Sequence, residues 1–308
     1  MISIIIPTYR NPEYLDICLK SAIEQQHNKN EIIVAIDGFI EESKEVLEKY
    51  KENINVLDLG KNQGMQTALN YGVMNATNEK IFIVNDDNVF CKDFDLEIEE
   101  YLQEKHVLTL NQIEPTGPGI FKFPVKDLGR NPKDFKYDEF IEYEQSIRKN
   151  ELSLDGGIFP FAMYKKYYMA VGGFDVMYKS PFICDWDFFL KLDLIGLGFT
   201  RTHNAHLYHF GSTATKNGNE GEKFKSKDHI LYVNEGNGAA TFNIALDEAL
   251  KMDDNDTVYF LENDYLHKPD SRVILEEAFE LGAQFVSLYD HPDKYIGPEQ
   301  GGNPYCEG

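Results

Sequence analysis

Short apolar runs alternate with amphipathic helical stripes over the first 84 residues, and no other feature of the sequence constrains the fold as strongly. The runs have the length and β-branched composition of buried strands, while the stripes repeat at helical spacing. A regular alternation of this kind builds an α/β fold, with a mostly parallel sheet and helices on both faces. We predict strands over Met1–Ile6, Glu31–Ile36, Ile54–Leu59 and Lys80–Val84, and helices that start near Pro12, Ser43 and Met65.

Polar residues follow each of the four predicted strands directly. The carboxyl ends of parallel strands meet at one edge of the sheet, where ligands of such folds bind. Turn residues that happen to be polar would explain each position singly, but four converging strand ends indicate a site. The residues are Thr8 after the first strand, Asp37 after the second, Asn62 and Gly64 after the third, and Asp86 and Asp87 after the fourth.

The composition is strongly acidic, with a formal net charge of −22 over 308 residues. Such a surface repels phosphate backbones and anionic headgroups, which argues against nucleic acid and anionic membranes as partners. No apolar run approaches the roughly 18 residues that span a bilayer, and the N-terminus lacks the basic region of a signal peptide. The cysteines are scattered without a CxxC pair. We therefore expect a soluble, cytoplasmic protein with reduced thiols and no membrane span.

Several segments resemble, in the same order, those of the family 2 glycosyltransferases, which have the Rossmann-like GT-A fold. The resemblance covers about the first 215 residues. It implies transfer of a sugar, with inversion, from a nucleotide-diphosphate sugar (UDP or dTDP) to a hydroxyl of a glycan acceptor. The segments are SIIIPTYRN at the start, IVAIDG at Asp37, KNQGMQTALN from Lys61, IFIVNDDN at Asp86, GGFD from Gly172, CDWDFFLKL around Asp185, and HFGST from His209.

The resemblance also implies roles for the residues at the strand ends. The family's DxD segment falls on Asn85-Asp86-Asp87, with Asn85 where the first Asp usually stands. Asp87 and His209 would then hold Mn²⁺ or Mg²⁺, the simplest way for an acidic protein to neutralise a diphosphate. The donor-binding set that the resemblance implies is Pro7, Thr8, Tyr9, Asp37, Asn62, Gly64, Asn85 and Asp86.

The resemblance also implies that Asp185 is the catalytic base. The family's acidic pattern reads Cys184-Asp185-Trp186-Asp187 here, so Cys184 stands in place of the first acid. The alternative is that Asp185 caps a helix over Asp185–Leu194, since Asp is a favoured N-cap. On the acceptor side we place Trp186, Asp187 and Gly156, although a core role for Trp186 stays open. Long loops over Asn111–Asn150, which lack periodicity, are expected to surround the cleft.

Three histidines, His203, His206 and His209, suggest a zinc site at first sight. Residues three apart on a strand point to opposite faces, so the three are not expected to converge.

The chain is expected to comprise a GT-A domain over 1–227 and a partial α/β unit over 228–308. The second segment repeats part of the first: Leu69 to Asp87 spans 18 positions, and so does Leu246 to Asp264. This pattern suggests an internal duplication that lacks a base pocket and a counterpart of Asp185. Either the parent protein continues beyond Gly308, or this unit packs against the first unit or against a partner chain as a homo-oligomer.

Two other functions compete with glycosyl transfer. A sugar nucleotidyltransferase would show a glycine-rich loop with Arg straight after the first strand, and Pro7-Thr8-Tyr9-Arg10-Asn11 is not such a loop. A non-catalytic pseudoenzyme that binds nucleotide sugars or carbohydrate is suggested by the replacements at Asn85 and Cys184. Nucleotide-sugar binding without turnover would distinguish it from the enzyme.

Overall fold

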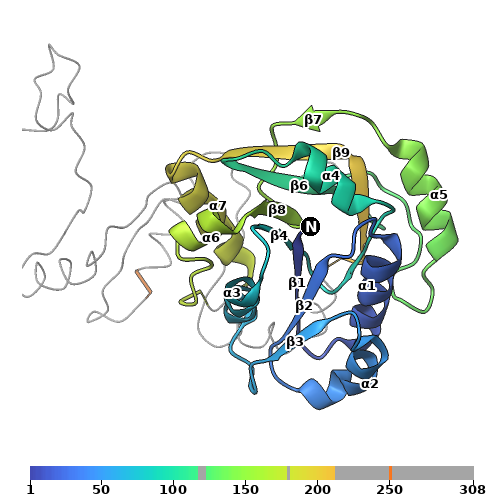
Figure 1. The fold of residues 1–308 in the computed structure, drawn as a ribbon, viewed down its shortest axis with the longest axis horizontal. Helices are drawn as coiled ribbons and strands as arrows, with labels where there is room; N and C mark the ends of the chain where they lie inside the picture. The colour runs from blue at the N-terminus through green and yellow to red at the C-terminus, as the bar shows by residue number, and fades with distance from the viewer. Residues whose placement is uncertain (117–122, 179–180, 212–249, 252–308) are drawn as a thin grey trace, which may run out of the picture. The chain divides into compact units, whose positions relative to one another are not determined.

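The computed structural model describes residues 1–116, 123–178, 181–211 and 250–251 (Figure 1). By its internal contacts the chain divides into two units, Met1–His229 and Ile230–Gly308, and nearly all described residues belong to the first. The predicted boundary at Lys227 and, apart from residues 250–251, the predicted partial copy over 228–308 lie outside the described residues. Both therefore stay predictions.

The N-terminal half is a regular β–α alternation that builds four parallel strands. In space these strands are ordered β3-β2-β1-β4, so the chain crosses back once after β3. The strand predictions are confirmed to within about two residues at each end, which is the usual scatter of element boundaries. The elements are β1 (Ser3–Thr8), α1 (Pro12–Gln25), β2 (Glu31–Ile36), α2 (Ile40–Tyr50), β3 (Asn55–Asp58), α3 (Met65–Asn75) and β4 (Lys80–Ile83).

The second half extends the same sheet with strands of mixed direction. The described strands form one nine-stranded sheet in the order β3-β2-β1-β4-β8-β6-β9-β5, with β7 paired to β9. Strand β8 runs antiparallel to both β4 and β6, and β9 is parallel to β6. The elements are β5 (Asn88–Val89), α4 (Phe94–Tyr101), β6 (His106–Ile113), α5 (Tyr137–Ile147), β7 (Leu152–Ser153), β8 (Phe161–Tyr164), α6 (Lys165–Ala170), α7 (Pro181–Leu194) and β9 (Gly198–His209).

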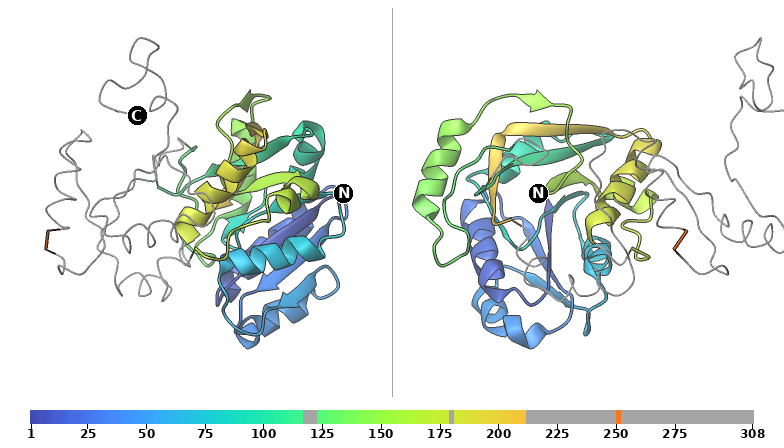
Figure 2. Two further views of the ribbon diagram at one scale, coloured as in Figure 1. Left: turned by 90° about the vertical axis from the view of Figure 1, so that its left-hand side faces the viewer. Right: turned by 180° about the vertical axis from the view of Figure 1, so that it is seen from behind.

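Helices cover both faces of the sheet, as the alternation predicts (Figure 1 and Figure 2). Side chains of β1 alternate between the faces: Ile4 and Ile6 pack toward α1 and α2, whereas Ile5 packs toward α3, α6 and α7. Helix α3 lies so close that a Cβ on Gly72 would come within 2.6 Å of the Ile5 side chain. The two apolar layers hold β1 rigidly, so its carboxyl end is a fixed platform.

Residues 111–150 differ from the prediction of long loops. Strand β6 continues to Ile113, and a helix, α5, occupies Tyr137–Ile147. Its apolar stripe is interrupted because a core-facing position carries Glu144, which is fully buried and pairs with Arg148 at 2.9 Å. A buried charge in the stripe hides helical periodicity from a hydrophobicity pattern.

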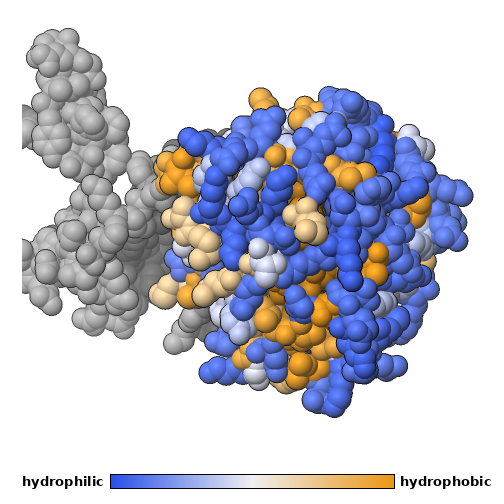
Figure 3. All heavy atoms as spheres, viewed as in Figure 1, coloured by the Kyte–Doolittle hydropathy of each residue, from blue (hydrophilic) through white to orange (hydrophobic). Residues whose placement is uncertain are grey.

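Hydrophilic side chains dominate the face of the described part that Figure 3 shows, in keeping with the net charge of −22. Within the described residues, no helix combines the length and apolar character that a membrane crossing requires.

Candidate functional site

The carboxyl ends of β1 and β4 are joined through Asp86. Thr8 Oγ1 donates a hydrogen bond to Asp86 Oδ2 at 2.6 Å, and Asn11 Nδ2 donates to Oδ1 at 3.1 Å. Burial, followed by the neighbouring charge of Asp87, raises the pKa of Asp86 to about 7. Asp86 therefore braces the start of α1 against β4, and one position on each of its oxygens is already filled by the protein.

Asp37 at the end of β2 organises the loop that leads into α3. Its two carboxylate oxygens accept the backbone N–H groups of Gln63 at 2.6 Å and Gly64 at 3.0 Å. The turn that carries Asp37 packs tightly on the same loop: a Cβ on Gly38 would lie 2.7 Å from the backbone nitrogen of Asn62. The strand ends of β2 and β3 thus approach each other, which places Asn62 and Gly64 beside Asp37 as predicted.

Two residues outside the predicted donor-binding set lie beside Tyr9. Arg10 and Phe39 both have left-handed backbones, with φ of 52° and 59°. The Arg10 guanidinium lies 4.7 Å from the Phe39 ring centroid, and the Tyr9 ring packs edge-on against Phe39 at 5.8 Å. Non-glycine residues in this conformation cluster at functional sites because the surrounding structure must hold them there. The available signal was an aromatic residue directly after a strand-end Asp-Gly turn.

His209 at the end of β9 lies between two carboxylates. Its Nε2 is 3.5 Å from Asp87 Oδ2, and its Nδ1 is 2.7 Å from Glu114 Oε1. Burial opposes the charged imidazolium, but the two carboxylates outweigh it and raise the pKa of His209 to about 10. Asp87 and His209 belong to the predicted metal site, whereas Glu114 was not predicted, because it follows β6 in a region that lacks periodicity.

Asp185 lies inside α7 and does not cap it. The helix starts at Pro181, so the alternative N-cap role is wrong. Cys184 Sγ donates to Asp185 Oδ1 at 3.4 Å, and burial, which outweighs that bond, raises the pKa of Asp185 to about 6. Gln66 Nε2, in the first turn of α3, donates to the Tyr178 carbonyl just ahead of α7. This bond ties the start of α7 to the carboxyl edge of the sheet.

The model of the family "Glycosyl transferase family 2" matches residues 3–171. The chain belongs to glycosyltransferase family 2. Asn85-Asp86-Asp87, the segment that the resemblance assigns to the family's DxD motif, follows β4 within the matched range.

Curated relatives and solved structures agree with the family. An uncharacterised glycosyltransferase of Haemophilus influenzae is 24% identical over 62% of this chain and 62% of its own length. Glycosyltransferase GlyG of Streptococcus pneumoniae is 28% identical over 34% of this chain and 36% of its own. The chain thus matches less than two thirds of the length of these relatives. The crystal structure of Staphylococcus aureus TarS 1–349 superposes with a TM-score of 0.51 at 19% identity, covering 68% of this chain and 60% of that one. That likeness shows the GT-A fold.

The side chains around Asp87 fit a divalent metal whose coordination shell is completed by oxygens of the substrate. Among the residues that the structure describes, no three His, Cys, Asp or Glu side chains form a cage for a metal ion. Asp87 and His209 offer an oxygen and a nitrogen side by side, and Mg²⁺ and Mn²⁺ commonly combine one or two protein ligands with phosphate oxygens and water. The residues therefore fit a metal shared with a diphosphate, and they do not form a closed structural site.

The residues predicted on the acceptor side have different surroundings. Trp186 is 73% exposed, so the alternative core role is wrong. Asp187 pairs with Lys191 at 2.9 Å one turn along α7. A Cβ on Gly156 would come within 2.4 Å of the Thr200 carbonyl oxygen, so a glycine is required for this loop to pack on β9. Of these three acceptor-side residues, Trp186 is the one that presents a wide apolar surface to solvent.

The other two histidines of β9 have partners of their own. His203 Nε2 is 2.9 Å from Ser153 Oγ, and the buried His206 Nδ1 is 3.5 Å from Glu144 Oε1. As strand geometry predicts, the three histidines do not converge.

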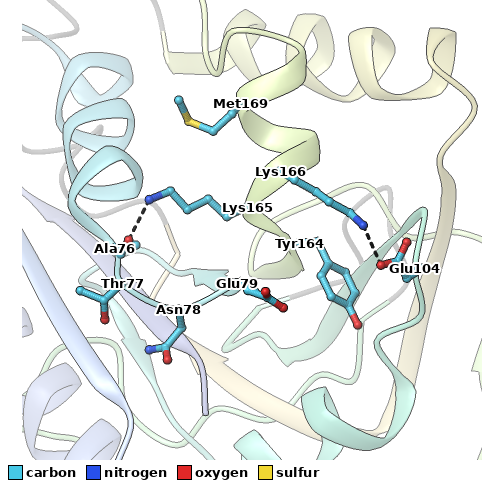
Figure 4. A pocket seen from close by; sticks show the side chains of 9 residues that line it. All are labelled: Ala76, Thr77, Asn78, Glu79, Glu104, Tyr164, Lys165, Lys166 and Met169. Atoms are coloured by element: carbon cyan, nitrogen blue, oxygen red, sulfur yellow. Dashed lines mark hydrogen bonds and ion pairs between the residues drawn. The ribbon is translucent and has the colours of Figure 1, made fainter.

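A pocket of about 540 Å³ lies away from all of these residues, at the amino end of β4 (Figure 4). Its lysines already have partners: Lys165 Nζ donates to the Ala76 carbonyl at 2.7 Å, and Lys166 pairs with Glu104 at 2.6 Å. Because ligands of parallel sheets bind at the carboxyl ends of strands, we do not assign this pocket to the donor.

Proposed function

We propose that this glycosyltransferase moves a sugar, with inversion, from a UDP- or dTDP-sugar to a hydroxyl of a glycan acceptor, with Mn²⁺ or Mg²⁺ bound. The observation that carries the proposal is that two groups of different chemistry are associated with the carboxyl edge of the sheet. Asp87 and His209 form the first group, and Asp185, with a pKa of about 6, forms the second. An in-line displacement needs both a group that receives charge at the leaving diphosphate and a base for the attacking hydroxyl.

Asp185 suits the role of base because its pKa lies close to neutral pH. At pH 7 the carboxylate is mostly ionised, yet it is a stronger base than an ordinary aspartate. Its Oδ1 receives the Cys184 thiol, which orients the group and leaves Oδ2 for an acceptor hydroxyl. The exposed ring of Trp186, the next residue, offers a surface on which an acceptor sugar can stack.

Asp87 and His209 would hold the metal, which when bound neutralises the charge of the departing diphosphate. Tyr9, Arg10 and Phe39 present aromatic and cationic groups at the ends of β1 and β2, where the nucleotide base would bind. Asp86 and Asp37 keep these strand ends in place through hydrogen bonds to Thr8 and to the loop at Gly64. Direct contacts of Asn85 and Asp86 with ribose or sugar hydroxyls belong to the same proposal.

Similar proteins support the proposed substrate class. TarS 1–349 has been crystallised with UDP and with UDP-GlcNAc. The poly-β-1,6-N-acetyl-D-glucosamine synthase of Staphylococcus aureus is 28% identical over 30% of this chain and 23% of its own length. We accordingly propose a UDP-sugar as the first donor to test and polysaccharide or glycan synthesis as the setting. A cytoplasmic location and self-association belong to the same proposal.

A donor screen tests the proposal. The full chain is incubated with Mn²⁺ and a panel of nucleotide sugars, and release of nucleoside diphosphate is measured beside Asp185→Asn and Asp87→Ala. We expect release from one donor that requires metal and falls at least about tenfold in both variants. Binding of a nucleotide sugar, seen as a thermal shift, without turnover under any acceptor condition would indicate the pseudoenzyme. No binding to any member of the panel would refute the proposed function.

A further inference from the structure

Glu114 is a carboxylate at the site that the proposed roles leave unused. It follows the last residue of β6, and its side chain is 19% exposed. Oε1 lies 2.7 Å from Nδ1 of His209, whose opposite ring nitrogen, Nε2, is 3.5 Å from Asp87 Oδ2. Glu114 thus contacts the Nδ1 side of the imidazole, and the Nε2 side faces Asp87.

The chemistry of the pair fixes which nitrogen faces the metal position. An ionised carboxylate only accepts hydrogen bonds, so the Nδ1 that contacts Glu114 must carry a hydrogen. Nε2 is then the nitrogen that would give up its proton and bind a metal beside Asp87. A histidine that binds metal commonly donates its other N–H to a carboxylate, which fixes both the tautomer and the ring orientation.

Main-chain hydrogen bonds hold the three residues independently of any ligand. The Glu114 N–H donates to the Pro124 carbonyl at 2.9 Å, and the Lys126 N–H donates to the Glu114 carbonyl at 2.9 Å. On the other side, the Phe210 N–H donates to the Asp87 carbonyl at 3.1 Å. The segments that carry Glu114, Asp87 and His209 are therefore positioned by backbone, as a preorganised site requires.

We propose that Glu114 is a positioning residue: it holds His209 with Nε2 directed at Asp87 and so sets the affinity of the site for a divalent cation. The inference rests on the proposed function, because the cation is the one that would neutralise the donor diphosphate. Glu114 contacts Nδ1, on the opposite side of the ring from Nε2, so it is not placed to bind that cation itself. Its effect on the cation passes through the histidine.

The test measures Mn²⁺ binding to the full chain, with saturating UDP, by calorimetry and by the electron paramagnetic resonance of free Mn²⁺. The variants are Glu114→Ala, Glu114→Gln, His209→Ala and the double variant with both alanines. Glu104→Ala, which removes an exposed carboxylate paired with Lys166 at the other edge of the sheet, is the matched control. Circular dichroism and thermal unfolding of each variant show whether the fold is kept.

We expect Glu114→Ala to weaken Mn²⁺ binding by about 10- to 100-fold, the usual cost of removing such a partner. Glu114→Gln keeps an acceptor for Nδ1–H and should stay within about threefold of the wild type, and Glu104→Ala should bind as the wild type does. The double variant should bind no more weakly than His209→Ala alone, because Glu114 acts through the histidine.

Two results would overturn this inference and leave the proposed function intact. The first is wild-type Mn²⁺ affinity in Glu114→Ala while His209→Ala binds Mn²⁺ more weakly. The second is an equal loss of Mn²⁺ affinity from Glu114→Ala in the presence and in the absence of His209. If Glu114→Ala does not fold, the inference is judged from the Mn²⁺ affinities of Glu114→Gln and His209→Ala. A wild-type chain that binds UDP but no Mn²⁺ would instead refute the metal dependence of the proposed function, and the inference with it.

Discussion

Asp185→Asn should abolish transfer and, at the same time, stabilise the protein. The folded protein raises the pKa of Asp185 from 3.8 to about 6, chiefly by burial. An acid whose pKa is raised on folding costs stability above its folded pKa, and the cost disappears as pH falls below the unfolded pKa. The shift of about two pKa units corresponds to about 3 kcal/mol at pH 7.5 and about 1 kcal/mol at pH 4.5. Asparagine removes the charge, keeps the shape, and leaves an oxygen to accept the Cys184 thiol.

The assay is urea unfolding of the wild type and Asp185→Asn at both pH values, followed by the fluorescence of Trp186. That residue is the only tryptophan in the chain and is on the same helix, so the signal reports the unit that contains Asp185. Asp187→Asn is the control, because it makes the same change two residues along α7 and breaks an ion pair with Lys191. An Asp185→Asn variant that is no more stable at pH 7.5 than the wild type would refute the energetic cost of burying this charge. A variant that still transfers sugar would refute the role of Asp185 as base.

Three further predictions follow from the same site. Thr8→Val removes the hydroxyl that donates to the buried Asp86 and should cost about 1–3 kcal/mol in urea unfolding at pH 8, whereas Thr8→Ser should restore most of it; equal stability of the two variants would contradict the bond. Gly38→Ala places a Cβ 2.7 Å from the facing loop at a φ of 81°, so thermal shifts with UDP should show weaker binding. Gly60→Ala, also at positive φ but with nothing within 4 Å, should bind UDP normally, and equal effects would exclude the close approach as the cause. The kcat/KM for the donor should fall tenfold per pH unit below about 6 as Asp185 takes up its proton, and a flat profile from pH 5 to 8 would remove Asp185 as the base.

The parts of the fold that the sequence predicts are those governed by local rules. Strands β1 and β2 are continuous apolar runs because both of their faces are buried, and Pro12 starts α1 because its missing N–H is not needed there. Parallel topology then brings the strand ends together without further information. This is why Thr8, Asp86 and Asp37 could be placed at one edge before any coordinates were known.

The parts of the fold and site that the sequence does not predict depend on contacts between distant segments. Helix α5 packs through a buried Glu144 whose partners are Arg148 and the backbone of His206, so its pattern does not look apolar. Glu114 acquires a role only because β6 and β9 lie side by side and bring it to His209. Phe39 has a left-handed backbone where its ring contacts Tyr9 and Arg10, and residue propensity does not predict that conformation. Each of these is a tertiary effect that a single sequence does not encode locally.

The two departures from the family pattern have a common electrostatic consequence. The resemblance aligns Asn85 and Cys184 with positions where the family usually has a carboxylate. Both residues are neutral: Asn85 has no titratable group, and burial raises the pKa of the Cys184 thiol well above its ordinary range. A second carboxylate at position 184 would repel Asp185 and raise its pKa beyond the value of about 6 that burial already produces. The thiol instead donates a hydrogen bond to Asp185, which favours the ionised base. In a chain with a net charge of −22, neutral residues at these two positions also lower the repulsion that an incoming diphosphate must overcome. The replacements that suggest a pseudoenzyme from the sequence are therefore compatible with a working base at Asp185, and the donor screen separates the two.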